Sequence, residues 1–376
     1  MFTDRQPGAC SDPHAEQLVG QPAGQPAEQL TGQSAGQHVE QFAGQRAEQL
    51  PEQPAGQLPN PPIGKTATVV DLSPDSQLGD YVCAIGVFDG LHEGHRFIID
   101  EAIAGAGQLG LPAIAITFDQ DPDELFSASF AQRKLLSNED RIAYLAASGV
   151  DSVFVIPFEP GLALLGPLDF LDTVIAAHGR PRGIHVGADF RFGHHASGTV
   201  EDLKLWGARH GCEVFAHELF SDEGASVTAT RIRDALQSGD LALANKLLMR
   251  PYYLWAQVVK GRAVGKSLGF PTANLLIDEG IVAPADGVYA GAVIIDGTLY
   301  RAAISVGIPA TFESASSTIE AHILDYEGDL YGRRVKALFF EFLRPMVAFD
   351  TVEELKRAVF QNIEQVRAYI LPKDRF

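Results

Sequence analysis

The sequence predicts an α/β domain built on a parallel sheet, followed by an antiparallel β-barrel that ends in a helix. Two observations lead to this fold class. In the first part of the chain, short apolar runs alternate with helical patterns, which is typical of the β-α units of a Rossmann-like parallel sheet. In the last part, closely spaced strand-like runs are separated by glycine turns, which is typical of a closed barrel. At 376 residues the chain is long enough for two such domains.

The first domain is expected to carry five strands and five helices. In such sheets, ligands bind beyond the carboxyl ends of the strands. The expected strands cover 81–87, 112–118, 151–157, 183–187 and 213–219, and the expected helices begin near 94, 138, 168, 199 and 229.

In the second domain, the strand-like runs cover 252–259, 287–295, 299–305, 318–325 and 333–341, and an amphipathic helix is expected from 351 to about 370. The segment around Gly265-Lys266-Ser267 superficially resembles a phosphate-binding Walker A loop. The glycine spacing is one residue short, however, and Gly269 and Pro271 interrupt the helix that such a loop should open. We therefore reject that interpretation.

The N-terminal segment has a different character. From Gln17 to Gln57 every fourth residue is glutamine. A period of four drifts around a helix and builds no lasting apolar stripe, so we expect disorder. The predicted organisation is a tail over 1–62, an α/β domain over 63–235, a helical linker over 236–250 and a barrel domain over 251–376.

Composition narrows the class of protein. The formal net charge of −19 argues against non-specific binding to nucleic acid or to an anionic membrane, although a small anionic substrate remains possible. Three cysteines without a C-x-x-C pair (Cys10, Cys83 and Cys212) fit a reducing compartment. No apolar run approaches the roughly 20 residues that span a bilayer. We expect a cytoplasmic protein with no nucleic-acid or membrane partner, and the oligomeric state stays open.

The stretch GVFDGLHEGH follows the first expected strand. A helix that starts near Gly94 would point its free N–H groups at an anion, and His92 and His95 could donate hydrogen bonds to phosphate oxygens. A zinc site fits less well, because His194 and His195 belong to another loop and no thiol joins them. The alternative is that the glycines only form a tight turn and the two histidines are incidental surface residues.

This stretch resembles the HxGH motif of the adenylyltransferase superfamily. Together with TFDQDPDELF, VGADFRFGHHASGT and TATRIRDALQSGD, it resembles the FMN adenylyltransferase half of the bifunctional riboflavin kinase/FAD synthetases. The resemblance implies that His92 and His95 hold the triphosphate of ATP. The residues that it further assigns to ATP and phosphate binding are Gly86, Phe88, Gly94, Asp189, Thr230, Arg231 and Arg233.

Two departures from the family pattern concern this half. Asp121 stands where the family commonly has histidine, and Thr228 and Ala229 stand where it commonly has two serines. The alternative interpretation of TRIR is a plain helix start, with Thr228 or Thr230 as the N-cap and solvated arginines.

The second domain resembles the riboflavin kinase barrel through GKSLGFPTANL, PADGVYAGAV, IEAHILDYEGDLYG and FLRPMVAF. The resemblance implies that Thr272 and Asn274 coordinate Mg²⁺ with ATP phosphates, oxygen ligands that this ion prefers. It also implies that Glu320 is the general base toward the riboflavin hydroxyl. The loop expected to fold over the nucleotide contains Gly261, Gly265, Lys266 and Gly269.

Two features of this half leave alternatives open. PTAN could be an ordinary turn and Glu320 a solvated strand residue. The family's NIGxRPTF appears as SVGIPATF at 305–312, which affects contacts expected there.

The sequence therefore predicts a Mg²⁺- and ATP-dependent enzyme that converts riboflavin to FMN and FMN to FAD, with release of pyrophosphate. One alternative is a riboflavin kinase whose adenylyltransferase half is impaired. The other is a flavin- or nucleotide-binding regulatory protein without turnover.

Overall fold

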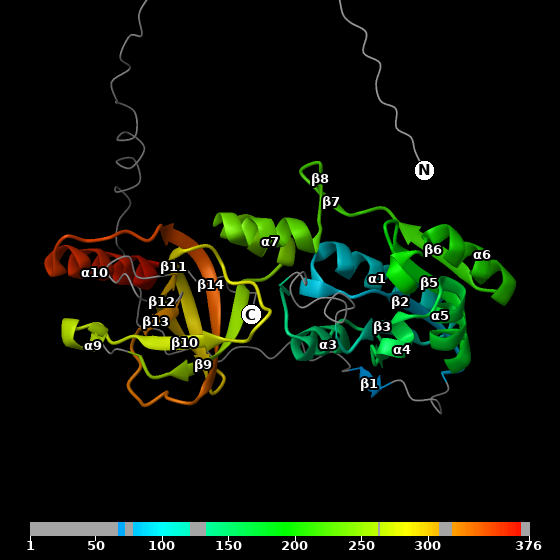
Figure 1. Cartoon of the computed structure of the whole chain (residues 1–376), viewed down its shortest axis with the longest axis horizontal. Coiled ribbons are helices and arrows are strands. Elements are labelled where there is room, and N and C mark those ends of the chain that lie inside the picture. The colour runs from blue at the N-terminus through cyan, green and yellow to red at the C-terminus, as the bar shows by residue number, and fades with distance from the viewer. Residues whose placement is uncertain (1–66, 72–77, 121–132, 262–263, 308–317, 370–376) are drawn as a thin grey trace, which may run out of the picture. The chain divides into compact units, whose positions relative to one another are not determined.

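The computed structural model describes residues 67–71, 78–120, 133–261, 264–307 and 318–369, which belong to one compact unit (Figure 1). The predicted tail over 1–62 lies outside the described residues. Asp121 and residues 308–312 of SVGIPATF also lie outside them.

The first domain contains a six-stranded sheet in the order β1-β4-β3-β2-β5-β6, and every neighbouring pair is parallel. This confirms the predicted parallel sheet. Strand β1 was not predicted from the sequence, and it extends the sheet beyond β4. The strands are β1 (Thr68–Asp71), β2 (Asp80–Ile85), β3 (Ala113–Phe118), β4 (Ser152–Ile156), β5 (Arg180–Gly187) and β6 (Glu213–His217).

Helices cover both faces of this sheet. Alternate side chains of a strand point to opposite faces, so Cys83 of β2 packs in the core beneath α5 and α6, whereas Ala84 packs beneath α1 and α3. The result is a three-layer α/β/α domain. The helices are α1 (Glu93–Leu109), α3 (Asn138–Ala146), α4 (Pro160–Ala163), α5 (Pro167–Val174) and α6 (Val200–His210).

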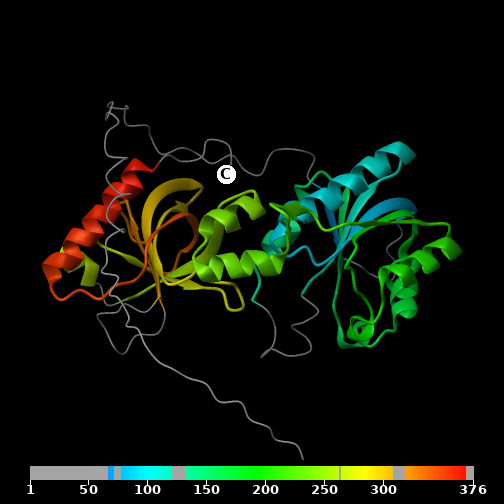
Figure 2. The ribbon, with the colours of Figure 1, turned by 90° about the horizontal axis from the view of Figure 1, so that it is seen from above.

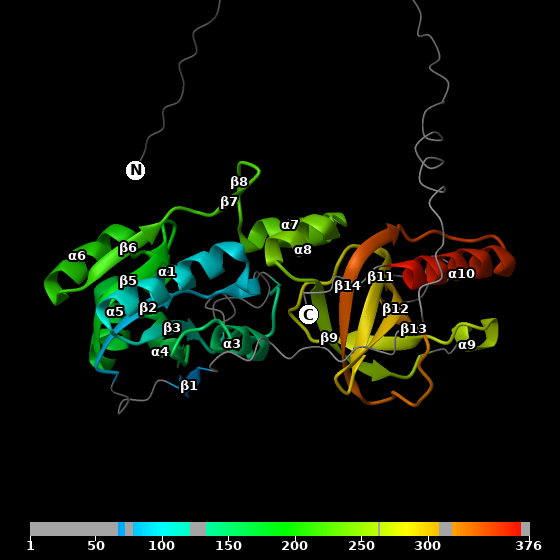
Figure 3. The ribbon, with the colours of Figure 1, turned by 180° about the vertical axis from the view of Figure 1, so that it is seen from behind.

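Two helices follow the sheet and lie side by side, α7 (Ala229–Ser238) and α8 (Leu241–Leu248) (Figure 3). Their apolar faces share one core with the interior of the barrel. A small hairpin of β7 (Ser221–Asp222) and β8 (Ala225–Ser226) precedes α7.

The second domain is a closed barrel in the order β10-β13-β12-β11-β14-β9, with antiparallel neighbours. This confirms the predicted barrel. Five of its strands were predicted and β10 was not. The strands are β9 (Tyr252–Val259), β10 (Ala273–Ile277), β11 (Gly287–Ile295), β12 (Thr298–Gly307), β13 (Thr318–Ile323) and β14 (Arg334–Arg344).

Two further helices belong to the barrel domain. The short helix α9 (Val264–Leu268) precedes β10. The predicted C-terminal helix is present as α10 (Val352–Ala368), with Thr351 as its N-cap, and it lies against the outside of the barrel (Figure 2). Its Ile363 and Val366 pack in one cluster with Ala290 of β11.

A buried carboxylate connects these elements. Asp89, which follows β2, accepts hydrogen bonds from the backbone N–H groups of Leu135 and Leu136 and forms an ion pair with Arg233 of α7. The side chain of Asp89 is 8% exposed and that of Arg233 is 14% exposed. Because a buried charge without its partner is strongly destabilising, this ion pair is expected to matter for the stability of the fold.

Substitution of this carboxylate should therefore destabilise the protein strongly. We expect Asp89→Ala to lower the free energy of unfolding by about 3 to 5 kcal/mol, since it removes the anion that neutralises Arg233 and accepts two buried N–H groups. Urea denaturation followed by circular dichroism measures the change. Lys204→Ala, which breaks the exposed Lys204–Glu201 pair, is the control and should leave the midpoint nearly unchanged. Equal midpoints for the two variants would contradict the prediction.

Candidate functional sites

The turn after β2 has an unusual backbone. Phe88 and Leu91 have φ angles of +58° and +40°, and Gly90 has +76°. A Cβ on Gly90 would lie 2.7 Å from a methyl carbon of Leu135, so only glycine fits there. Left-handed backbone at residues other than glycine costs on the order of 1–3 kcal/mol each and is concentrated at functional sites. The turn ends at His92, the N-cap of α1.

The two histidines of this turn stack on each other, with ring centroids 3.6 Å apart. The backbone N–H of His95 donates to His92 Nδ1 at 3.3 Å. Nδ1 therefore carries no proton, and in the neutral ring Nε2 is the N–H donor. His95 Nδ1 is fully shielded from solvent and has no hydrogen-bond partner among the described residues.

Both imidazoles are neutral at physiological pH. Burial, followed by the nearby charges of Arg250 and Arg233, lowers the pKa of His92 to about 4. Burial is also the main cause that lowers the pKa of His95, with contributions from His92 and Arg141. The pair thus offers uncharged hydrogen-bond donors at the N-terminus of a 17-residue helix.

Three more of the residues assigned to ATP binding lie at or near these rings. Phe88 is 2% exposed and contacts His95 edge-on, with ring centroids 5.4 Å apart, so it packs against the imidazole of His95. A Cβ on Gly86 would lie 3.2 Å from the Phe88 ring. A Cβ on Gly94 would lie 3.3 Å from the His92 ring and 3.4 Å from the carbonyl oxygen of Val227. Glycine at 94 thus lets the start of α1 approach the residue before the N-cap of α7.

The segment TATRIR does begin a helix. Thr228 is its N-cap, because its Oγ1 accepts a hydrogen bond from the N–H of Arg231, and Thr230 is exposed. The guanidinium of Arg231 donates to three carbonyl groups of the β7–β8 hairpin and pairs with Asp222. Arg233 pairs with Asp89. Both arginines that the resemblance assigns to phosphate are thus engaged with protein groups.

Asp189 lies beyond the carboxyl end of β5. It is exposed, and its Oδ1 would be 2.9 Å from a Cβ on Gly187, a position that also faces Ile98 of α1. The structure therefore places Asp189 near α1, at the edge of the sheet where ligands bind in this class of fold.

Sequence reasoning missed Arg141, which organises the same edge. Its side chain is 1% exposed and donates to the carbonyl oxygens of Val87 at 3.0 Å and Phe118 at 2.7 Å. It therefore joins the carboxyl ends of β2 and β3. The signal in the sequence is its place on the apolar face of α3, one turn before the buried Leu145.

The barrel brings together the three residues assigned to kinase chemistry. Thr272 Oγ1 donates to Glu320 Oε2 at 3.1 Å. Asn274 of β10 stands directly opposite Glu320 of β13 in the antiparallel ladder. All three are partly buried. Asn274 of PTAN belongs to the barrel strand β10, and Glu320 is partly buried with its carboxylate hydrogen-bonded to Thr272.

The predicted nucleotide loop runs next to these residues. A Cβ on Gly261 would collide with the Asn274 side chain, and one on Gly265 would lie 3.3 Å from Thr272 Oγ1. Gly269 has a φ of +95°, which favours glycine. Lys266 lies in the five-residue helix α9, and its side chain is outside the described part of the structure.

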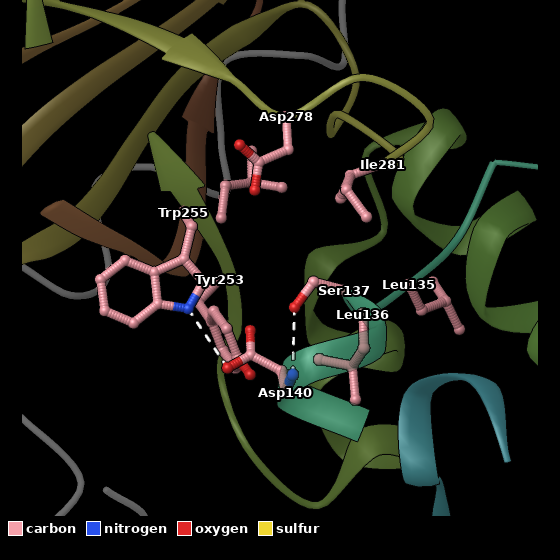
Figure 4. Close-up of a pocket in the computed structure, with 9 residues that line it drawn as sticks. Leu135, Leu136, Ser137, Asp140, Tyr253, Trp255, Asp278 and Ile281 are labelled. Atoms are coloured by element: carbon pink, nitrogen blue, oxygen red, sulfur yellow. Dashed lines mark hydrogen bonds between the residues drawn. The ribbon is translucent and has the colours of Figure 1, made fainter. Parts of the chain in front are cut away.

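One small cavity lies between α3 and β9 (Figure 4). Trp255 Nε1 donates to Asp140 at 3.2 Å on its wall, and Asp140 N donates to the N-cap Ser137. The cavity volume of about 10 Å³ is close to the minimum that holds a single water. The cavity is too small for a nucleotide or a flavin.

No helix in the described ranges has both the length and the apolar character needed to cross a membrane.

Comparisons with known proteins match each of the two domains. A FAD synthetase family model matches residues 75–231, and a riboflavin kinase model matches residues 248–370. A solved structure from Streptococcus pneumoniae, named a macrolide-efflux protein, superposes with a TM-score of 0.71 at 31% identity and covers 80% of this chain and 99% of its own.

Curated relatives extend this similarity over both domains. The bifunctional riboflavin kinase/FMN adenylyltransferase of Pseudomonas fluorescens is 32% identical over 77% of this chain and 93% of its own length. The protein of the same name from Escherichia coli K12 is 32% identical over 75% of this chain and 90% of its own. The chain therefore belongs to the bifunctional riboflavin kinase/FMN adenylyltransferase family.

Proposed function

We propose that the barrel phosphorylates riboflavin to FMN and that the α/β domain adenylylates FMN to FAD, each with ATP. The observation that carries this proposal is that the barrel brings Thr272, Asn274 and Glu320 together. In the α/β domain, His92 and His95 form a stacked pair. Neither an impaired adenylyltransferase half nor a non-catalytic binding role is favoured by any feature of the described sites. The two free, buried cysteines of the described chain, Cys83 and Cys212, suit a cytoplasmic location.

The kinase reaction requires a base. The primary hydroxyl of riboflavin must lose its proton as its oxygen attacks the γ-phosphorus, and Glu320 is the carboxylate available to accept it. The hydrogen bond from Thr272 fixes one carboxylate oxygen and leaves the other available to the substrate. Glu320 therefore acts as the general base.

Magnesium fits the donors around Glu320. Among the described residues no group of three or more His, Cys, Asp or Glu could hold a metal alone, so the ion would bind jointly with ATP phosphates. Mg²⁺ is often held in this way, by one or two protein oxygens and several phosphate oxygens. Thr272 Oγ1 and the Asn274 amide oxygen would supply the protein ligands, and the chemistry supplied by a bound ion would be neutralisation of phosphate charge.

The adenylylation reaction makes a different demand. The attacking phosphate of FMN is already an anion, so no base is needed, and the charge that develops on the pyrophosphate leaving group has to be stabilised. The neutral donors His92 and His95, together with the N-terminus of α1, are placed for that role.

The base can be tested by one isosteric change. Glu320→Gln keeps the size of the side chain and a hydrogen-bond acceptor for Thr272, but removes proton acceptance, so FMN formation should fall by about 10² to 10⁴. Product analysis by chromatography with riboflavin, ATP and magnesium measures it. FAD formation from supplied FMN is the control in the same preparation and should persist. A variant that still phosphorylates riboflavin at the wild-type rate would rule Glu320 out as the base.

The reciprocal change tests the sheet site. His92→Ala combined with His95→Ala should reduce FAD formation by roughly 10² or more for each donor lost. Riboflavin phosphorylation should continue, so FMN should accumulate. Loss of both activities in a protein that circular dichroism shows to be folded would contradict the assignment of separate sites.

The neutral state of the histidines predicts a pH dependence of stability. Their pKa values are lowered in the folded state, so above about pH 6.5 neither state binds a proton there, and as the pH falls from 6.5 toward 4 the unfolded state is protonated first. Stability is therefore full above this window and is lost within it. We expect His92→Gln with His95→Gln to lose less stability than the wild type between pH 7.5 and pH 5, measured by urea denaturation. Parallel losses in the two proteins would contradict neutral histidines.

A further inference from the structure

Strand β13 presents a second functional side chain beside Glu320. Residues two apart on a strand share one face, so His322 lies on the same face as Glu320. In the ladder between β10 and β13, Asn274 pairs with Glu320 and Ala273 pairs with Ala321. One step further, beyond the last paired residues, His322 stands level with Thr272.

His322 makes a defined contact at this position. Its Nδ1 lies 2.8 Å from the carbonyl oxygen of Pro271. A carbonyl oxygen can only accept, so Nδ1 is protonated and donates. The imidazole therefore continues the strand pairing after the backbone ladder has ended, where Pro271 itself has no N–H to offer.

This hydrogen bond restrains the main chain at Thr272. The carbonyl oxygen of Pro271 and the nitrogen and Cα of Thr272 lie in one planar peptide unit. Holding the oxygen consequently restricts the plane of this peptide and the position of the Thr272 Cα. Glu320 holds the Oγ1 of the same residue at 3.1 Å, so β13 anchors Thr272 from both its main chain and its side chain.

Packing restrains only part of this segment. Pro271 and Gly269 are exposed, and no Cβ added at Gly269 would touch another atom, whereas Phe270 between them is buried against α10. Phe270 therefore anchors the segment on one side, and the hydrogen bond from His322 acts on the Pro271–Thr272 peptide itself. Because a misplacement of about 1 Å can cost roughly 10² in rate, the anchor on Pro271 is expected to matter for catalysis.

We propose that His322 is a positioning residue of the kinase reaction. It holds the Pro271–Thr272 peptide so that the side chains of Thr272 and Glu320 are correctly placed for magnesium-bound ATP. The proposal rests on the roles proposed above for Thr272 and Glu320. His322 acts through Thr272 and takes no proton from riboflavin.

Two amides of different length test this role in the full-length protein. Asn places its amide nitrogen as many bonds from Cα as histidine Nδ1, whereas Gln places it one bond further out. His322→Asn should keep the donor and retain riboflavin phosphorylation within a few-fold of the wild type. His322→Ala and His322→Gln should raise the KM for magnesium-ATP and lower kcat, together by roughly 10² in kcat/KM.

FAD formation, unfolding midpoints and the KM for magnesium-ATP separate positioning from mere structural support. FAD formation from FMN should be equal in all three variants, and the order of their unfolding midpoints should differ from the order of their kinase losses. Equal KM for magnesium-ATP in the wild type and His322→Ala, or a His322→Asn variant as slow as His322→Ala, would overturn the proposal. Glu320→Gln is assayed in parallel: if it remains active, the proposed function of Glu320 fails, whereas an inactive Glu320→Gln beside a fully active His322→Ala refutes only the role of His322.

Discussion

The buried carboxylate of Asp89 is the constraint on which the turn after β2 depends. It belongs to the turn itself, yet its partners come from two distant parts of the chain, the backbone at Leu135 and Leu136 and the guanidinium of Arg233. The strained backbone around it is stable only if such contacts determine its conformation. The position of His92, three residues later, follows from that anchoring.

The same anchor connects the turn to the barrel. Lys134, just before the residues that Asp89 holds, exchanges backbone hydrogen bonds with Gly280 and Val282 in the segment after β10. Arg250, just before β9, donates to the carbonyl oxygen of Gly90. Leu135, the buried faces of α7 and α8, and the barrel interior form a single apolar core. The turn that carries the first site is therefore supported by residues of the domain that carries the second.

The sequence was sufficient for most of the fold because the decisive signals are local. Apolar runs gave the strands of the parallel sheet, and glycine turns gave most of the barrel. The strands that were missed depend on pairing rather than on composition: β1 has four residues, and β10 begins within PTAN at Ala273, two residues after Pro271. Non-local partners, β4 for the first and β9 and β13 for the second, determine both.

The motif residues could be predicted, whereas the residues that hold them could not. Asp89 lies within the most conspicuous motif of the chain, but a turn residue and a buried ionic anchor look the same until Arg233, 144 positions later, is seen beside it. Arg141 and His322 contact backbone carbonyl groups, which every residue type offers, so the sequence does not identify these partners even where the place of Arg141 on the apolar face of α3 signals burial. Such contacts become visible only when distant strands are brought into register.

The two sites differ in how they can accommodate an anionic substrate. The chain has a net charge of −19 and binds anionic substrates, yet its arginines at the first site are engaged with Asp89 and with the β7–β8 hairpin. Neutral imidazoles and a helix N-terminus can meet an anion without the cost of burying unpaired cations. At the second site, the proposed base Glu320 is itself an anion, because a hydroxyl nucleophile needs a base. In the proposed reaction, the hydroxyl of Thr272 and the amide of Asn274 beside it would suit a divalent cation, rather than a cationic side chain, as the group that offsets the negative charge.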